Sequence, residues 1–247
     1  MRDRPAADAS VPMIMALCLV LREDPDLGAR IAGAELIEAT RRCVATEVTV
    51  ATGYWEPGEE AIAARGGFGL LMLDGLLVRR VGTHGRFGAE LLGAGDLLRP
   101  WEDGGEDLTP PFQVLFTVAE EVRLAILDAD FAARAARYPS VAATLAARAM
   151  MRSRTLAIGM AIAHYPQIRR RLLLLLWHIA DRWGRVTPEG VRIPLHLPHE
   201  LLADLVAARR PAVTTALGQL ADEGLVVRDQ RGYLLTGDLL AALDRDG

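Results

Sequence analysis

The chain has 247 residues, of which 51% are hydrophobic and 24% charged, and its formal net charge is −4. This composition is typical of a globular protein with one large or two ordinary domains, and we predict two. The acidic balance argues against a protein coated for nonspecific nucleic-acid binding, although it leaves room for a local basic face. All 28 basic residues are arginine, which we interpret as the codon bias of a GC-rich genome rather than as a sign of function.

The N-terminal segment is expected to be helical. Residues 1–10 are polar and should be frayed, and the pattern from Pro12 to about Ala45 predicts helix with a break at 24–26. The apolar run Val11–Leu21 is near signal-peptide length, but acidic residues precede it and no small-residue cleavage site follows. The leucine-rich run 172–180 is far shorter than the roughly 20 residues of a membrane span. We therefore predict a cytoplasmic protein with no membrane segment.

The two cysteines, Cys18 and Cys43, lie in apolar surroundings. They lack the clustered spacing that zinc or iron–sulfur ligation requires. We predict buried free thiols in a reducing compartment, and no metal site.

Between 46 and 127 the sequence changes to short apolar runs divided by glycine and proline, which predicts an antiparallel β domain. The runs are EVTVAT, GFGLLMLDGLLVRRV, AELLGAG, FQVLFTV and EVRLAIL. Leu73–Gly75, LDG, is interpreted as a hairpin turn. His84 is the only histidine of this region, and we expect a hydrogen-bonded turn residue rather than a haem ligand. Aromatic residues either pack in the core or line a pocket for an apolar molecule; they are Trp55, Phe68, Trp101 and Phe112.

From about 130 to 163 the pattern predicts a long helix, interrupted or re-entered at Pro139. A stripe with alternating spacings of four and three runs along it through Val141, Leu145, Arg148, Arg152, Thr155, Gly159 and Ile162. Such a stripe suits a parallel two-helix contact with a second copy, in which Gly159 allows close approach. The alternative is a helix packed only on its own β domain, which the two arginines on the stripe favour.

Tyr165 and Pro166 indicate the boundary between the long helix and the C-terminal domain, since the residue before a proline disfavours helix. A mostly apolar helix is expected from Gln167 to Trp183. Its three arginines, 169–171, either touch phosphates or form a solvated helix start.

The stretch 201–226 predicts two helices that meet at a tight corner of small residues. Pro211 suits the first turn of a helix, so the second helix should begin near Arg210, and Gly224 should end it. Two short apolar runs, LVVR and YLLT, follow with hairpin spacing. Helix, corner, helix and hairpin together predict a winged helix-turn-helix.

The second helix of such a motif can enter the major groove of DNA. Arginine can bind guanine O6 and N7 with two donors, and threonine offers a hydroxyl and a methyl group to base edges. His199, near the start of the first helix, is placed to meet a phosphate; Pro198 breaks the one-turn spacing that a metal pair with His196 would need. The expected DNA-contacting residues are His199, Arg209, Arg210, Pro211, Thr214, Thr215 and, on the hairpin, Arg228 and Arg231.

The run VRIPLHLPHELLADLVAARRPAVTTALGQLADEGLV resembles the DNA-binding domain of the Crp/Fnr family, from Val191 to about Leu240. The resemblance implies that Arg210 reads a base and that Arg209 contacts phosphate. Pro211 and Thr215 match two further base-facing positions. The turn position that the family fills with glycine is Ala207, which is tolerable if the corner avoids positive φ. Because Pro211 replaces a side chain that often reads a base, the operator of the best-known members should not be transferred.

The same resemblance makes the β region a sensor domain of the β-roll type, related to cyclic-nucleotide-binding domains. GFGLLMLDGLLVRRV fits its central hairpin, and LLGAGDLLRPW fits its glycine–aspartate turn. Cyclic-nucleotide binders follow this turn with a glycine–glutamate helix and an arginine that neutralises the phosphate. Here Gly95 and Asp96 lead into an acidic, proline-bound loop in which Arg99 is the only cation. We therefore predict that cyclic AMP is not a tight ligand, and we predict no cofactor and an unknown effector.

The resulting hypothesis is an α+β transcription regulator that acts as a homodimer on a two-fold symmetric operator. We expect N-terminal helices and an antiparallel β-roll sensor over 1–129, a dimerisation helix over 130–164, and a winged helix-turn-helix over 165–247. Double-stranded DNA and a second copy are the expected partners, with RNA polymerase and a small-molecule effector as further candidates. The alternative is a sensor or scaffold whose winged helix binds protein. An enzyme is not expected, because no catalytic set of side chains has meaningful spacing in one segment.

Overall fold

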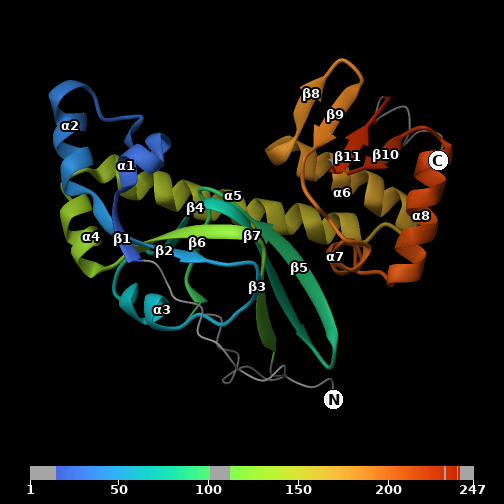
Figure 1. Cartoon of the computed structure of the whole chain (residues 1–247), viewed down its shortest axis with the longest axis horizontal. Coiled ribbons are helices and arrows are strands. Elements are labelled where there is room, and N and C mark those ends of the chain that lie inside the picture. The colour runs from blue at the N-terminus through green and yellow to red at the C-terminus, as the bar shows by residue number, and fades with distance from the viewer. Residues whose placement is uncertain (1–14, 101–111, 231, 238, 240–247) are drawn as a thin grey trace. The chain divides into compact units, whose positions relative to one another are not determined.

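The computed structural model describes residues 15–100, 112–230, 232–237 and 239. Two parts of the sequence prediction, the frayed residues 1–10 and most of the acidic loop around 101–111, lie outside these residues. The chain separates into two units, one of residues 1–79 and 91–152 and one of residues 80–90 and 153–247. Their elements are labelled in Figure 1, and each unit is described by itself. Among the described residues, no helix is long and apolar enough to cross a membrane.

The described part of the first unit begins with a strand at Met15, where the sequence analysis expected helix. Strand β1 is Met15–Leu19, and it pairs antiparallel with β2, Val44–Val50. The helical pieces are α1 (Val20–Glu23), the 3-10 helix η1 (Pro25–Gly28) and α2 (Gly33–Arg42). A five-residue apolar run fits helix and strand equally well from sequence alone. Pairing with β2 decides the outcome in favour of strand.

The expected antiparallel β domain is present. Its sheet has the strand order β1-β2-β7-β4-β5, with β3 on β7 and β6 on β4. The further elements are β3 (Gly53–Trp55), α3 (Glu59–Ala63), β4 (Gly69–Thr83), β5 (Arg86–Leu92), β6 (Leu97–Leu98) and β7 (Gln113–Leu127). FQVLFTV and EVRLAIL, which look like two strands in the sequence, are one continuous strand.

The prediction of a hairpin turn at Leu73–Gly75 is wrong. These residues lie inside β4, where Gly75 has φ +90° and a Cβ at this position would lie 2.1 Å from the carbonyl oxygen of Glu121. Glycine is therefore needed for close approach to β7 rather than for a chain reversal. The reversal comes after β4, at His84 and Gly85, whose φ values are 51° and 74°. Two consecutive positive φ values are typical of a tight hairpin turn.

Two helices follow the sheet. Helix α4 is Ala129–Ala135, and the Asp128 side chain caps it by accepting a 2.7 Å hydrogen bond from the Phe131 amide. Helix α5 is Pro139–Ala163. The stripe that suggested a two-helix contact faces the protein's own core at its start, since Val141 and Leu145 are buried in one cluster with Leu27 and Phe131. The expected helix is confirmed, but this part of its stripe is not available to a second copy.

The second unit contains α6 (Ile168–Trp183), α7 (His199–Leu205) and α8 (Arg210–Asp222). Its strands β8 (Arg185–Thr187), β9 (Gly190–Ile193), β10 (Val226–Asp229) and β11 (Gly232–Leu235) form a sheet with the order β10-β11-β9-β8. Helix α8 packs on both α6 and α7, as Figure 1 shows. Strands β10 and β11 pair antiparallel, which confirms the hairpin expected after the second helix.

Candidate nucleic-acid interface

The corner between α7 and α8 sets the angle at which α8 is presented. The chain turns at Ala207, whose φ is 51°, and the Ala208 amide donates a 2.9 Å hydrogen bond to the Ala203 carbonyl. The sequence analysis accepted alanine here on condition that the corner avoids positive φ, and that condition is not met. The turn keeps its left-handed geometry and carries the steric cost of a Cβ at this position.

The arginines at the start of α6 have partners within the unit, and one of them, Arg171, contacts this corner. One guanidinium nitrogen of Arg171 donates to the carbonyls of Val206 and Ala207, at 3.1 and 3.3 Å. Arg169 is paired with Glu223, and the Arg170 guanidinium lies 4.9 Å from the centre of the Tyr165 ring. The three arginines therefore have partners within the unit, and contact with phosphates stays a prediction.

Helix α8 begins at Arg210 with Pro211 in its first turn, as the sequence predicts. One face is buried and carries Val213, Ala216, Leu217 and Leu220. The other face is exposed, and the structure brings the predicted residues Arg209, Arg210, Pro211, Thr214 and Thr215 together on it. The apolar face fixes the helix to the domain, which leaves the guanidinium and threonine groups accessible to a partner.

The two threonines of this face are already engaged with the helix backbone. The Thr214 and Thr215 hydroxyls donate to the carbonyls four residues earlier, at 3.1 and 3.2 Å, and Thr214 also contacts His199. An engaged hydroxyl hydrogen cannot be given to a base acceptor at the same time. The exposed Thr215 thus offers an acceptor oxygen and a methyl group.

The wing contributes a further cation. Arg228 of β10 is exposed, and its guanidinium lies 2.9 Å from Nε2 of His199, the first residue of α7. Burial and the neighbouring Arg228 and Arg210 lower the pKa of His199 below its ordinary 6.5. Arg231 lies outside the described residues. The sequence analysis missed Arg192 of β9, which pairs with Asp229 of the wing at 2.9 Å; no local motif indicates a contact between residues 37 positions apart.

The glycine–aspartate turn of the first unit is the other candidate site. Here the polar groups face the protein itself: the Asp96 carboxylate accepts a 2.8 Å hydrogen bond from the Gly93 amide, and Arg99 donates to the Gly67 carbonyl at 3.2 Å. From α5, Arg148 pairs with Asp24, and Arg152 donates to the Leu97 carbonyl at 3.0 Å.

Other predicted residues of the β region have packing or local roles. The Trp55 and Phe116 rings meet edge to face at 5.4 Å, and the Trp55 indole donates to the buried Glu60. His84 lies at the hairpin, with Nδ1 2.9 Å from the Thr83 hydroxyl. Both cysteines are buried free thiols, as predicted, and burial raises the pKa of Cys18 to about 11. Within the described part of the chain, no three metal-ligating side chains gather; Trp101 lies outside it.

Comparison with known proteins gives the same assignment for the C-terminal part. A family model described as a Crp-like helix-turn-helix domain matches residues 170–243. No curated protein sequence matches the chain significantly.

Solved structures match the fold over most of the chain. A mutant of CooA from Carboxydothermus hydrogenoformans is 16% identical with a TM-score of 0.64, and the match covers 90% of this chain and 95% of that one. A CRP-family transcriptional regulator from Thermus thermophilus is 23% identical with a TM-score of 0.56, covering 80% and 95%. A cyclic nucleotide-binding domain-containing protein from Listeria monocytogenes is 14% identical with a TM-score of 0.64, covering 85% and 96%.

The fold is thus that of these solved structures, with a cyclic-nucleotide-binding-like β domain, as expected from the sequence. Residues 170–243 thus form a Crp-like helix-turn-helix domain whose exposed second helix begins at Arg210, and this domain supports the function of a DNA-binding transcription regulator.

Proposed function

We propose that the protein binds a two-fold symmetric operator as a homodimer and that α8 reads the major groove. The observation that carries the proposal is the exposed face of α8, which starts at Arg210 and is fixed by a fully apolar underside. In this role Arg210 and Thr215 meet base edges, Pro211 lies against them, and Arg209 binds phosphate. The location we propose is the cytoplasm, and the role is regulatory rather than catalytic.

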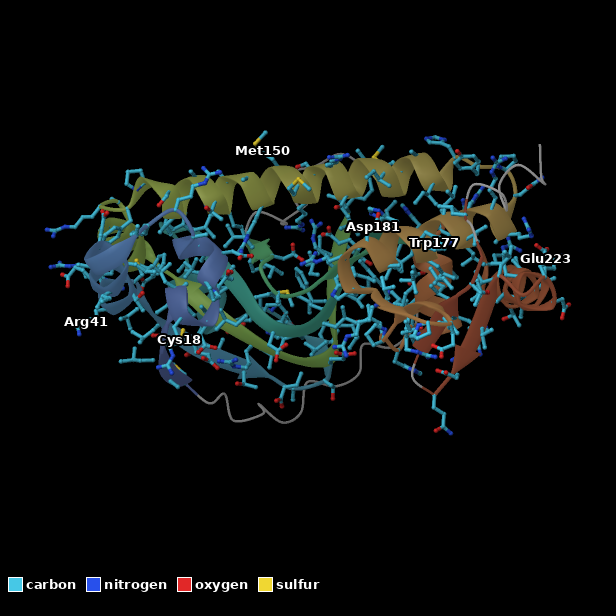
Figure 2. The ribbon with its side chains drawn as sticks, turned by 90° about the horizontal axis from the view of Figure 1, so that it is seen from above. Cys18, Arg41, Met150, Trp177, Asp181 and Glu223 are labelled. Atoms are coloured by element: carbon cyan, nitrogen blue, oxygen red, sulfur yellow. The ribbon has the colours of Figure 1, made fainter. Side chains whose placement is uncertain are left out.

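The proposed dimer uses α5, but through another face than the stripe through Val141. Five exposed residues recur at alternating spacings of four and three: Ala146, Met150, Ser153, Ala157 and Met160. Met150 is 74% exposed and Met160 66%, and Figure 2 shows Met150 projecting outward from α5. Small residues permit close approach and methionine fills the gaps, so this face suits a second copy of the helix. The domain assignment stays as proposed from sequence: sensor 1–129, dimerisation helix 130–164 and DNA-binding domain 165–247.

Changing Arg210 tests the DNA-reading role. Fragments selected from random DNA supply the operator, and two half-sites about 34 Å apart are expected for a dimer. Arg210→Ala should weaken operator binding by about 1–3 kcal/mol and relax one base position, whereas Arg209→Ala should weaken all sequences alike. Fluorescence anisotropy with operator and scrambled duplexes measures both. Equal losses on both duplexes for Arg210→Ala would remove the assigned role. Specific DNA binding should weaken steeply as the salt concentration rises, since neutralising the phosphates releases counterions. If the affinity for DNA does not depend on salt, the alternative of a winged helix that binds protein is favoured.

The dimer face has a matched test within α5. Met150→Glu places a charge on the proposed contact, and we expect a monomer in sedimentation analysis and loss of high-affinity operator binding. Met151→Glu is the control, because Met151 is also exposed, at 57%, but lies about 100° further around the helix. If both variants remain dimers, another face joins the copies.

The sensor unit is proposed to respond to something other than cyclic AMP. Arg99, the cation nearest the glycine–aspartate turn in sequence, is held on the Gly67 carbonyl. Calorimetric titration with cyclic AMP should give no heat of tight binding. Micromolar or better affinity would overturn this part of the proposal.

A further inference from the structure

Three elements of the second unit meet at one imidazole. His199 is the first residue of α7; its Nδ1 lies 2.8 Å from the Thr214 hydroxyl on α8, and its Nε2 lies 2.9 Å from a terminal guanidinium nitrogen of Arg228 on β10. The scaffold helix, the recognition helix and the wing are therefore connected through one side chain.

The partners determine where the imidazole hydrogen is. A guanidinium has only donors, so Nε2 of His199 must accept from Arg228 and cannot carry hydrogen. The hydrogen of a neutral ring is then on Nδ1, which donates to the Thr214 oxygen. That oxygen can still donate its own hydrogen, and the Arg210 carbonyl lies 3.1 Å away to accept it. The chain of donors runs in one direction, from Arg228 through His199 and Thr214 to the first residue of α8.

This series of hydrogen bonds uses only one of the guanidinium N–H donors of Arg228. The same guanidinium lies 5.9 Å from the centre of the Tyr233 ring, which is its cross-strand partner on β11. Tyr233 is buried, and its hydroxyl donates a 3.0 Å hydrogen bond to the Leu197 carbonyl. Arg228 is thus held between a fixed ring and a fixed imidazole while its side chain stays exposed.

We propose that His199 is a positioning residue that, as the neutral Nδ1–H tautomer, orders Arg228 of the wing for a DNA phosphate and keeps it in register with α8. The inference rests on the proposed DNA-binding function. A free arginine side chain loses rotamer freedom when it binds, so ordering it beforehand strengthens binding without a new contact. Thr214 then supports this arrangement and does not read a base with its hydroxyl.

The two nitrogens of the ring can be replaced separately. In His199→Gln the amide oxygen reaches the place of Nε2 and can accept from Arg228, whereas in His199→Asn the shorter amide reaches only the place of Nδ1 and can donate to Thr214. His199→Ala removes both contacts. His196→Ala is the control, because His196 is three residues earlier and exposed.

Operator affinity is measured by fluorescence anisotropy for these variants and for Arg228→Ala. We expect His199→Ala and His199→Asn to weaken binding about tenfold, as for the loss of a hydrogen bond to a charged group, and His199→Gln to stay within about threefold of the parent. The double variant His199→Ala with Arg228→Ala should be no weaker than Arg228→Ala alone. A long-range proton–nitrogen NMR spectrum of the free protein should show hydrogen on Nδ1.

Two affinity results would overturn the inference: additive losses for His199→Ala and Arg228→Ala, or equal affinities for the Gln and Asn variants. An NMR spectrum of the free protein that places the hydrogen of His199 on Nε2 would also overturn the inference, and this measurement needs no DNA. These failures differ from failure of the proposed function, in which the parent protein itself shows no operator preference and Arg210→Ala changes nothing.

Discussion

Arginines lie both on the helix-turn-helix surface and near the glycine–aspartate turn of the first unit, but their surroundings are opposite. Arg210 begins the exposed first turn of α8, while the apolar residues of the helix face the domain. At the sensor turn, Arg148 and Arg152 are engaged by Asp24 and by the Leu97 carbonyl. The guanidinium group at the start of α8 is thus exposed to a ligand, whereas those near the glycine–aspartate turn are engaged within their own unit.

The difference explains why one site can be inferred from local sequence and the other cannot. The exposure of the α8 face follows from helical periodicity over one short segment. The partner of Arg148 is 124 residues away in sequence, and no local pattern contains it. A sensor turn must therefore be judged from its long-range contacts.

The sharpest way to break this comparison is to remove one arginine from each region and measure folding. Arg148→Ala leaves the Asp24 carboxylate, 12% exposed, without its bidentate partner. We expect a loss of about 2 kcal/mol in the free energy of unfolding, between the values for exposed and buried pairs. Arg210→Ala should change it by less than about 0.5 kcal/mol, as surface substitutions do. Urea unfolding of both variants checks this.

A repair variant separates the ion pair from simple loss of packing. Arg148→Met combined with Asp24→Asn removes both charges and keeps most of the volume, so it should recover part of the lost stability. A double variant less stable than Arg148→Ala would mean that packing, not the ion pair, holds α5 at this point.

The sequence predicts elements best where their signals are local. Pro211 and the apolar stripe are sufficient to place α8, and LVVR and YLLT are sufficient for the wing. The failures are decided by distant partners: Met15–Leu19 is a strand because β2 pairs with it, and Gly75 serves a close approach to Glu121. The 4-3 stripe of α5 identifies an apolar face, but spacing alone does not say whether the face meets the protein's own core or a second copy. For the DNA-binding set, the residue types were predictable, whereas the hydrogen-bonded role of Thr214 required the fold.

Ala207 offers a smaller test within the DNA-binding unit. Its φ of 51° is costly for alanine and free of strain for glycine, although glycine also gains entropy in the unfolded chain. Ala207→Gly should therefore raise the free energy of unfolding by about 0.5–1 kcal/mol. The neighbouring Ala208→Gly should lower it by a similar amount, because Ala208 does not have positive φ. Loss of stability in Ala207→Gly would show that the left-handed corner is not the strained point.

The smallest expected effect is a dependence of unfolding on pH that comes from two histidines of the second unit. Burial lowers the pKa of His178 on α6, and burial with Arg228 and Arg210 lowers the pKa of His199, both from an ordinary 6.5. A histidine with a lowered folded pKa favours the native state above the unfolded pKa, and this stabilisation is lost as the pH falls through the folded pKa. Stability should consequently fall when the pH is lowered from about 7.5 to about 5.5, a range in which histidine is the side chain that ordinarily titrates.

Urea unfolding at these two pH values measures the effect. His178→Gln should reduce the difference in the free energy of unfolding between them, whereas His196→Gln, at an exposed position, should leave that difference unchanged. If the parent protein is equally stable at both pH values, the two imidazoles are not held neutral by the fold.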